Sequence, residues 1–369
     1  IAAHARSLVN FRGPLLAGMV ARGHEAHAAA PGLSDDTATT VSLHAMGVAT
    51  HDIHFDRTGL NPAADLHALI ALVRLMRRIR PDVSLGYAIK PVIWGTLAAA
   101  LAGVAHRHAL ITGLGHAFSG EARGKRRIVQ TTVRALYARA LARAETVFFQ
   151  NPDDAALFRT SRLVPPRARC VVVNGSGVDL DHFAPAPYPD GPPAFLMVSR
   201  LLGAKGSREY AAAARAVLTT HPQARFHLVG GFDPGPDCIT PEQVSAWQDE
   251  GILTWHGPLE DVRPAIAATH VCVLPSYYGE GTPRCVLEAM AMGRPVITTD
   301  APGCRETVVA GDNGFLVPVR QVEPLTAAMR RFLDDPALVA RMGRRSAHIA
   351  EHKYDACKVS AVMLDEMGL

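Results

Sequence analysis

The sequence predicts an α/β protein built from two Rossmann-like, doubly wound domains that face each other across a cleft. Three observations predict this fold class. The chain has 369 residues, enough for two domains with sizeable cores. Short apolar runs alternate with helical patterns along nearly the whole chain, which is typical of parallel sheets with a site at the carboxyl ends of their strands. A stretch rich in Pro and Gly divides this alternation into two series.

The first series covers residues 1–178 and predicts the N-terminal domain. Residues 1–5 resemble the end of a strand, so we expect some residues before Ile1 and leave a targeting segment open. Asn61 and Pro62 suit the cap and first turn of a long helix. Residues 91–105 are shorter than the about 20 residues that cross a bilayer, and predict a buried helix. The remaining elements are strands at 24–30, 47–55, 82–86, 105–112 and 146–150, and helices at 14–22, 61–79, 92–102 and 125–144.

The second series follows a linker that we place at residues 179–193. It predicts a C-terminal domain at 194–353, followed by a C-terminal helix at 354–369. The expected strands are 194–199, 224–229, 252–255, 271–274 and 295–298, and the expected helices are 205–218, 259–268, 283–292, 322–333 and 336–351.

The composition is that of a soluble globular protein, with 48% hydrophobic and 20% charged residues. Its six Cys show no CxxC pair and no zinc-like spacing with His, and are typical of buried residues in a reducing compartment. Basic residues outnumber acidic ones in the first half, where two clusters suggest an anionic partner such as a membrane surface. No aromatic residues interleave with these charges, which argues against nucleic acid. The clusters are Arg74, Arg77, Arg78 and Arg80, and Arg123, Lys125, Arg126 and Arg127, followed by Arg134, Arg139 and Arg143.

The stretch 274–300 predicts a strand, a Gly-rich loop and a helix. Thr282 suits the N-cap of this helix and Pro283 its first residue, so the free backbone amides at the helix start form an anion site. Two carboxylates, Glu280 and Glu288, bracket that start. Taken alone, two such residues are also typical of solvated surface acids.

The segment GEGTPRCVLEAMAMGRPVI, with its Glu-x7-Glu pattern, resembles the donor-site motif of retaining glycosyltransferases of family 4. These enzymes have the GT-B fold, in which the C-terminal helix returns to the first domain. The resemblance implies that Glu280 contacts the donor sugar and that Glu288 contacts the ribose hydroxyls. It also implies that backbone amides at Gly281 and Thr282 bind the diphosphate. Gly230 and residues 255–259 are then expected to hold the base and ribose.

The loop SRLLGAKG carries two cations, Arg200 and Lys205, after a strand. The resemblance implies that both bind the diphosphate of a sugar nucleotide. Departure of a nucleoside diphosphate needs positive charge where negative charge develops, and these two residues supply it without a metal. Asp179 and Asp181 spell a DxD motif, but they lie in NGSGVDLDHF, which resembles the family's interdomain segment. We therefore expect no metal and no cofactor.

Three first-domain segments, SLVNFRG, YAIKP and ITGLGHAF, resemble the subgroup that extends polyprenyl-diphosphate-linked sugars. The resemblance implies acceptor-side roles for Asn10, Arg12 and Lys90, and a nucleotide-sugar contact for Gly13. His116 is expected to contact the reacting sugar or the acceptor, although a lone His is often structural and this subgroup more often has an aromatic there.

Together these features predict a metal-independent, retaining hexosyltransferase. It is expected to move a sugar from a nucleotide, most simply UDP, to a polyprenyl-diphosphate-linked saccharide, forming an α linkage in surface-glycan synthesis. The expected location is cytoplasmic, peripheral on the inner face of the cell membrane. Two alternatives stay open: a UDP-sugar 2-epimerase, which shares the two-domain fold, and a non-catalytic protein that binds sugar nucleotides or membranes.

Overall fold

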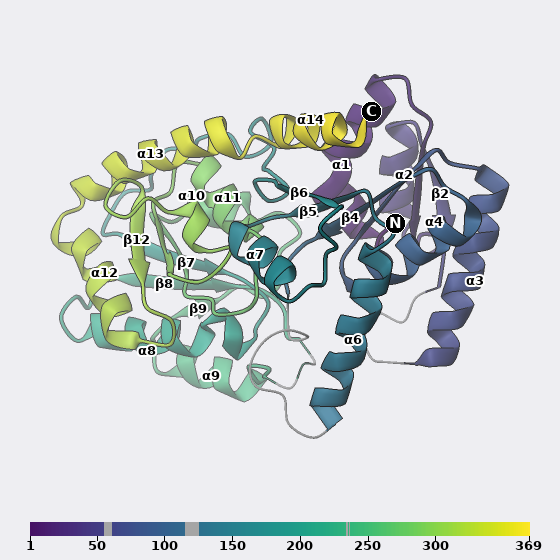
Figure 1. Ribbon diagram of the computed structural model, residues 1–369. Helices are drawn as coiled ribbons and strands as arrows, with labels where there is room; N and C mark the ends of the chain where they lie inside the picture. The colour runs from purple at the N-terminus through teal and green to yellow at the C-terminus, as the bar shows by residue number, and fades with distance from the viewer. Residues whose placement is uncertain (55–60, 115–124, 234, 236) are drawn as a thin grey trace. The chain divides into compact units, whose positions relative to one another are not determined.

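The computed structural model describes residues 1–54, 61–114, 125–233, 235 and 237–369, with the backbone alone at 125 and 126. The chain divides into two compact units (Figure 1). The first contains Ile1–Gly177 and Ala356–Leu369, and the second contains Val178–Asp355. Both units are built on parallel sheets with helical crossovers, which confirms the predicted α/β class.

The sheet of the first unit has the strand order β3-β4-β5-β6, with a separate pair, β1-β2, and all the pairings are parallel. Residues 1–5 form no strand of their own. The backbone of Ile1 nevertheless hydrogen-bonds to Leu85 and Tyr87, and Ala2 donates to Ala29 at 2.9 Å. The first two residues therefore bond to both β1 and β3. The strands are β1 (Ala26–Ala30), β2 (Val48–Asp52), β3 (Val83–Tyr87), β4 (His106–Ile111), β5 (Thr146–Phe149) and β6 (Arg169–Val172).

The helices of the first unit differ from expectation most at the N-terminus. Helix α1 begins at Arg6, not at Pro14, which lies inside it. Pro14 withholds one backbone hydrogen bond, but the helix continues because Leu8, Leu15 and Leu16 are buried on one side of it. The helices are α1 (Arg6–Ala21), α2 (Thr37–Ala45), α3 (Pro62–Ile79), η1 (Pro91–Gly95), α4 (Thr96–Ala102), α6 (Lys125–Leu141), α7 (Pro152–Thr160) and α14 (Ala356–Met367).

Side-chain caps explain several helix starts in this unit. Asn61 accepts from the Ala64 amide at 3.3 Å, which confirms the predicted cap of α3. Asp36 caps α2 and Asn151 caps α7 in the same way. Both helices, and strand β6, were absent from the sequence prediction because they are short and weakly periodic, although the two caps were a usable signal.

The apolar segment after β3 forms η1 and α4, whose Val92, Ile93 and Ala98 are buried, as predicted. Over the described residues, none of the helices combines the length and apolarity needed to cross a membrane. At the other end of the chain, α14 lies beside α1 (Figure 1), and Arg22 donates to Asp365 at 2.7 Å.

The sheet of the second unit is entirely parallel, with the strand order β12-β11-β10-β7-β8-β9. The order reverses between β7 and β10, because the chain builds outward from β7 in one direction and from β10 in the other. In open α/β sheets such a reversal leaves a crevice at the carboxyl ends of the two strands, where ligands bind. The strands are β7 (Ala194–Val198), β8 (Arg225–Val229), β9 (Thr254–Trp255), β10 (Val271–Leu274), β11 (Val296–Thr299) and β12 (Gly314–Val317).

Helices cover this sheet and bury a continuous core that includes Phe195, Phe226 and Leu287. Helix α8 packs against α12, and α11 against α13. The sequence prediction lacked α9 and β12. The helices are η2 (Gly203–Lys205), α8 (Ser207–Leu218), α9 (Pro241–Asp249), α10 (Arg263–Ala267), α11 (Arg284–Ala291), η3 (Arg305–Thr307), α12 (Val322–Asp334) and α13 (Ala337–Lys353).

A buried arginine ties the predicted linker to this unit. The Arg294 side chain lies in the interior and donates to the linker carbonyls of Ala186 and Pro187. Its guanidinium also lies 4.8 Å from the centre of the Tyr188 ring. The other acceptors are the carbonyls of Ile266, Ala267, Thr269 and Met292.

Candidate functional site

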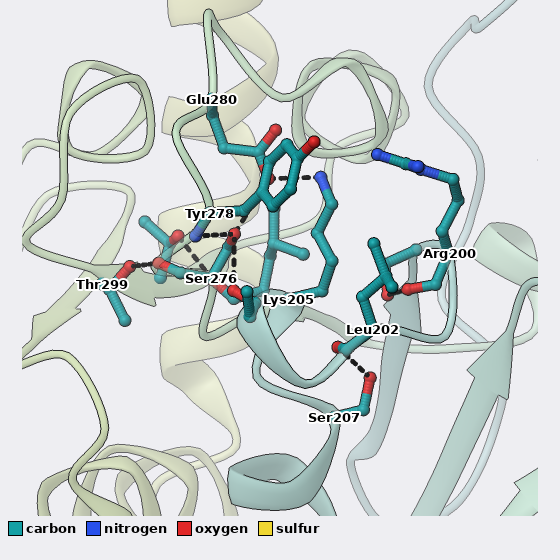
Figure 2. Close-up of polar contacts among 12 residues, drawn as sticks. Arg200, Leu202, Lys205, Ser207, Ser276, Tyr278, Glu280 and Thr299 are labelled. Carbon is teal, nitrogen blue, oxygen red and sulfur yellow. Dashed lines mark hydrogen bonds and ion pairs between the residues drawn. The ribbon is translucent and has the colours of Figure 1, made fainter. Parts of the chain in front are cut away.

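The loops after β7 and β10 meet at the reversal of strand order in the second unit, and they carry the predicted cations and the first predicted glutamate (Figure 2). Tyr277 donates its amide to the Ala204 carbonyl at 2.9 Å, which joins the two loops. Gly206 has a φ of 84°, and a Cβ there would overlap the Pro275 carbonyl. Only glycine therefore allows the loops to approach this closely.

Lys205 and Glu280 form an ion pair at this point. The Lys205 ammonium donates to Glu280 Oε1, and the Ser276 hydroxyl donates to the same oxygen at 2.9 Å. The side chains of Lys205 and Glu280 are only 13% and 10% exposed. The residue expected to bind the diphosphate and the residue expected to hold the sugar are therefore in direct contact.

Arg200 also lies close to the Tyr278 ring. Its guanidinium carbon is 5.6 Å from the centre of the Tyr278 ring, and the Lys205 ammonium is 4.8 Å from it. Arg200 also pairs with Asp233 at 2.5 Å. Sequence reasoning missed Ser276, Tyr278 and Asp233, although the first two lie inside the stretch 274–300 that predicts the strand, loop and helix.

The helix that begins near Glu280 starts one residue later than predicted. Pro283 is the N-cap, with an extended backbone (ψ of 113°), and Arg284 is the first helical residue. Thr282 is therefore not the cap, and the structure records no side-chain cap bond at this helix start. Gly281 and Thr282 are buried directly before the helix. Gly303 packs so closely beneath them that a Cβ would overlap the Gly281 carbonyl.

Glu288 lies on α11 and pairs with Arg284 at 2.7 Å, one helical turn earlier. Burial raises the pKa of Glu288, and the contact with Arg284 opposes this rise. Arg284 was missed by sequence reasoning, although its i, i+4 spacing with a glutamate was a usable signal. The carboxylate predicted to contact the ribose is therefore already oriented by a neighbouring cation.

Gly230 brings the end of β8 against the loop that carries Arg200. Its φ is 147°, and an added Cβ would overlap the Ser199 carbonyl oxygen. The Trp255 indole donates to the Gly230 carbonyl at 2.9 Å and packs on Phe232, with ring centres 5.1 Å apart. The residues predicted to hold the base and ribose therefore lie beside the Arg200 loop.

The site residues predicted in the first unit are the acceptor-side Asn10, Arg12 and Lys90, the nucleotide-sugar contact Gly13, and His116. Those that the structure describes do not form one cluster of exposed groups. Asn10 is exposed on α1, whereas Arg12 is buried with its guanidinium 5.1 Å from the Tyr87 ring centre. Lys90 pairs with Asp65 at 2.8 Å, and both side chains are largely buried. Gly13 is buried on α1, where a Cβ would make an ordinary contact at 3.7 Å with Met46. His116 lies outside the described residues.

The DxD motif has a local structural explanation. Asp179 accepts from the backbone amides of Asp181 and His182, at 3.1 and 3.0 Å, and so closes a turn. One group with a spacing suited to a metal ion is present among the described residues. It is the exposed set His348, Glu351 and His352 on α13.

The basic clusters lie on two helices of the first unit. Arg74, Arg77 and Arg78 belong to α3, and Arg80 forms its left-handed C-cap. Ile128 and Val129 are exposed hydrophobic residues in the first turns of α6. The remaining basic residues of α6 with described side chains are Arg127, Arg134 and Arg139, with Arg143 just beyond the helix. Arg123 and the side chains of Lys125 and Arg126 lie outside the described part.

Comparisons with known proteins agree with the resemblance. The glycosyl transferase 4-like domain matches residues 12–175, and the domain of the glycosyl transferases group 1 matches residues 192–335. A Campylobacter jejuni protein is 27% identical over 93% of this chain and 91% of its own length. It is an N,N'-diacetylbacillosaminyl-diphospho-undecaprenol α-1,3-N-acetylgalactosaminyltransferase. An Escherichia coli UDP-Gal:α-D-GlcNAc-diphosphoundecaprenol α-1,3-galactosyltransferase is 28% identical over 74% of this chain and 72% of its own.

Solved structures show the same fold. Sucrose-phosphate synthase from Thermosynechococcus elongatus superimposes with a TM-score of 0.76 at 20% identity, over 95% of this chain and 90% of its own. Anabaena Alr3699/HepE in complex with UDP gives a TM-score of 0.74 at 17% identity, over 100% and 98% of the two chains.

Proposed function

The chain belongs to the GT-B glycosyltransferases, with a glycosyl transferase 4-like domain followed by a group 1 domain. From this premise we propose that it transfers a hexosyl group from UDP to a saccharide linked to a polyprenyl diphosphate. We further propose that the transfer needs no metal, retains the configuration of the donor sugar and forms an α linkage during surface-glycan synthesis.

The names of two relatives support the acceptor and the linkage. Both the C. jejuni and the E. coli proteins are named for an α-1,3 transfer to a sugar on diphospho-undecaprenol, and the E. coli protein is named for UDP-Gal as donor. The C. jejuni relative matches nearly the full length of both chains, so its acceptor class is the better guide to this one.

The observation that carries the proposal is the meeting of Arg200, Lys205 and Glu280 at the strand-order reversal. In the proposed reaction, the two cations and the start of α11 stabilise the charge that develops on the departing diphosphate. Glu280 accepts hydrogen bonds from hydroxyl groups of the donor sugar and so fixes the orientation of that sugar. Glu288, held by Arg284, does the same for the ribose. The departing diphosphate takes the acceptor's proton on the face that the acceptor approaches.

We also propose that the first unit places the enzyme on the cytoplasmic face of the cell membrane. Basic residues of α3 and α6 would attract anionic headgroups, and the exposed Ile128 and Val129 would insert beside them. The test is co-sedimentation with vesicles containing an anionic lipid. Combined neutralisation of Arg123, Lys125, Arg126 and Arg127 should weaken binding, and unchanged binding would contradict the proposal.

A donor panel with a polyprenyl-diphosphate-linked acceptor tests the reaction. The predicted result is nucleotide release together with a product enlarged by one hexose, joined through an α linkage in its NMR spectrum. A UDP-sugar 2-epimerase would instead change the donor without any acceptor.

The transfer assay with EDTA present should retain its rate. His352→Ala is the control, because it removes one possible ligand of the exposed set on α13. If transfer needs no metal at that set, the variant should keep the natural rate.

A further inference from the structure

We propose that Tyr278 is a positioning residue that holds Arg200 and Lys205 together so that both cations meet the departing diphosphate. This inference rests on the proposed function and deepens it, because neither the motif nor the comparisons assign a role to this side chain. Figure 2 shows the ring of Tyr278 beside the Lys205 ammonium, with the Arg200 side chain reaching toward the same space.

Each cation pairs with a carboxylate, and both cations lie near the same aromatic ring. Arg200 pairs with Asp233, Lys205 pairs with Glu280, and both lie within 6 Å of the centre of the Tyr278 ring. Two cations that face the same small space repel each other, so a group that attracts both is needed to keep them there.

The ring differs from the carboxylates in how it responds to an arriving diphosphate. Asp233 and Glu280 repel an anion and compete with it for the same cations. An aromatic face attracts cations through its quadrupole and carries no net charge, so it keeps Arg200 and Lys205 in place after the diphosphate binds. Tyr278 is therefore a shared partner of both cations that does not oppose the substrate.

Hydrogen bonds tie the backbone of Tyr278 to the ion pair. Tyr278 donates its amide to the Ser276 hydroxyl at 3.2 Å, and that hydroxyl donates to Glu280 Oε1 at 2.9 Å. One serine hydroxyl therefore links the backbone of Tyr278 to the Glu280 carboxylate. Movement of the ring would disturb both cations and leave the Lys205 and Glu280 pair less confined.

The test compares Tyr278→Phe, which keeps the ring face, with Tyr278→Leu, which removes it. We expect Tyr278→Leu to lower kcat by about tenfold and to weaken UDP binding in calorimetry, with little change in acceptor KM. Tyr278→Phe should stay within about threefold of the natural protein. The matched control is Tyr277→Leu, because the neighbouring Tyr277 ring lies against Arg320, whose guanidinium carbon is 4.5 Å from the ring centre.

Unchanged kcat and UDP affinity in Tyr278→Leu would overturn the inference, and so would an equal loss in Tyr278→Phe. A loss in Tyr278→Leu that is matched by Tyr277→Leu and by a fall in melting temperature would show a structural role instead. UDP binding separates this inference from the proposed function. If the natural protein binds UDP but transfers no sugar, the proposed function fails, while the affinity ratio of the Tyr278 variants still decides the role of the ring.

Discussion

Lys205 and Glu280 are ion-paired although 75 residues separate them in the chain. Each follows one of the two strands that flank the reversal of strand order, so the topology of the sheet creates the contact. Because both side chains are buried, removal of one partner leaves the other charge uncompensated.

The first prediction concerns the energetic coupling of this pair. Lys205→Met and Glu280→Gln should each lower the free energy of unfolding by about 3 kcal/mol, because a buried pair is broken. The double variant should lose clearly less than the sum, since neither charge then remains unpaired. Denaturant unfolding of the four proteins measures this. Strict additivity would mean that solvent already screens the pair.

The second prediction concerns Gly230, whose backbone conformation and close contact with Ser199 exclude any side chain. Gly230→Ala should lower stability by about 1–3 kcal/mol and weaken UDP binding, because the Arg200 loop must move. Gly231→Ala is the matched control, since its Cβ would meet Pro258 at an ordinary 3.6 Å. Equal effects of the two substitutions on melting temperature and UDP affinity would contradict the steric argument.

The third prediction separates a buried arginine from an exposed one. Arg294→Met should destabilise the protein by at least about 3 kcal/mol, because six backbone carbonyls each lose a hydrogen bond from the guanidinium at once. Arg345→Met, which breaks an exposed pair with Asp312, should cost less than about 1 kcal/mol. Chemical denaturation of both variants provides the comparison. A small loss for Arg294→Met would show that water replaces the guanidinium.

The fourth prediction is a pH dependence caused by His108 on β4. Burial lowers the pKa of His108 to about 4, and neither ring nitrogen has a hydrogen-bond partner among the described residues. The folded state therefore favours the neutral ring. The stabilising contribution of the neutral His108 ring should be fully present above the unfolded pKa of about 6.5. As the pH falls from there through 4, the free energy of unfolding should decrease by about 3 kcal/mol in all.

His108→Leu should flatten this part of the stability curve, measured by denaturant unfolding between pH 4 and pH 7. His24→Leu, at an exposed position, is the control and should leave the slope unchanged. The same slope in His108→Leu and the natural protein would assign the pH dependence to other groups.

Hydrophobic alternation predicted most of the strands and long helices, because each buried strand or helix face needs several apolar residues in register. Hydrophobic alternation did not predict the elements whose formation or limits depend on only a few residues. Helix α1 continues through Pro14 because core packing outweighs one lost hydrogen bond. Strand β12 begins at Gly314 and contributes only three apolar residues in a row.

The candidate site was predictable where it depends on strand ends and motif spacing, which place Arg200, Lys205 and Glu280 after β7 and β10. Its fine structure was not. Asp233 and Tyr278 interact with the cations through loops whose course no pattern in the sequence specifies. The one-residue shift of the α11 cap from Thr282 to Pro283 also depends on local backbone geometry.

The central claim is that the Lys205 and Glu280 site transfers a hexose to a polyprenyl-diphosphate-linked saccharide. Its most direct test measures UDP release and product mass together for the natural protein, Glu280→Ala and Lys205→Ala. We predict equal amounts of UDP and of product enlarged by one hexose. We also predict that each variant loses at least about tenfold in rate while its circular dichroism spectrum is unchanged. UDP release without product growth, or full transfer by either variant, would contradict the account.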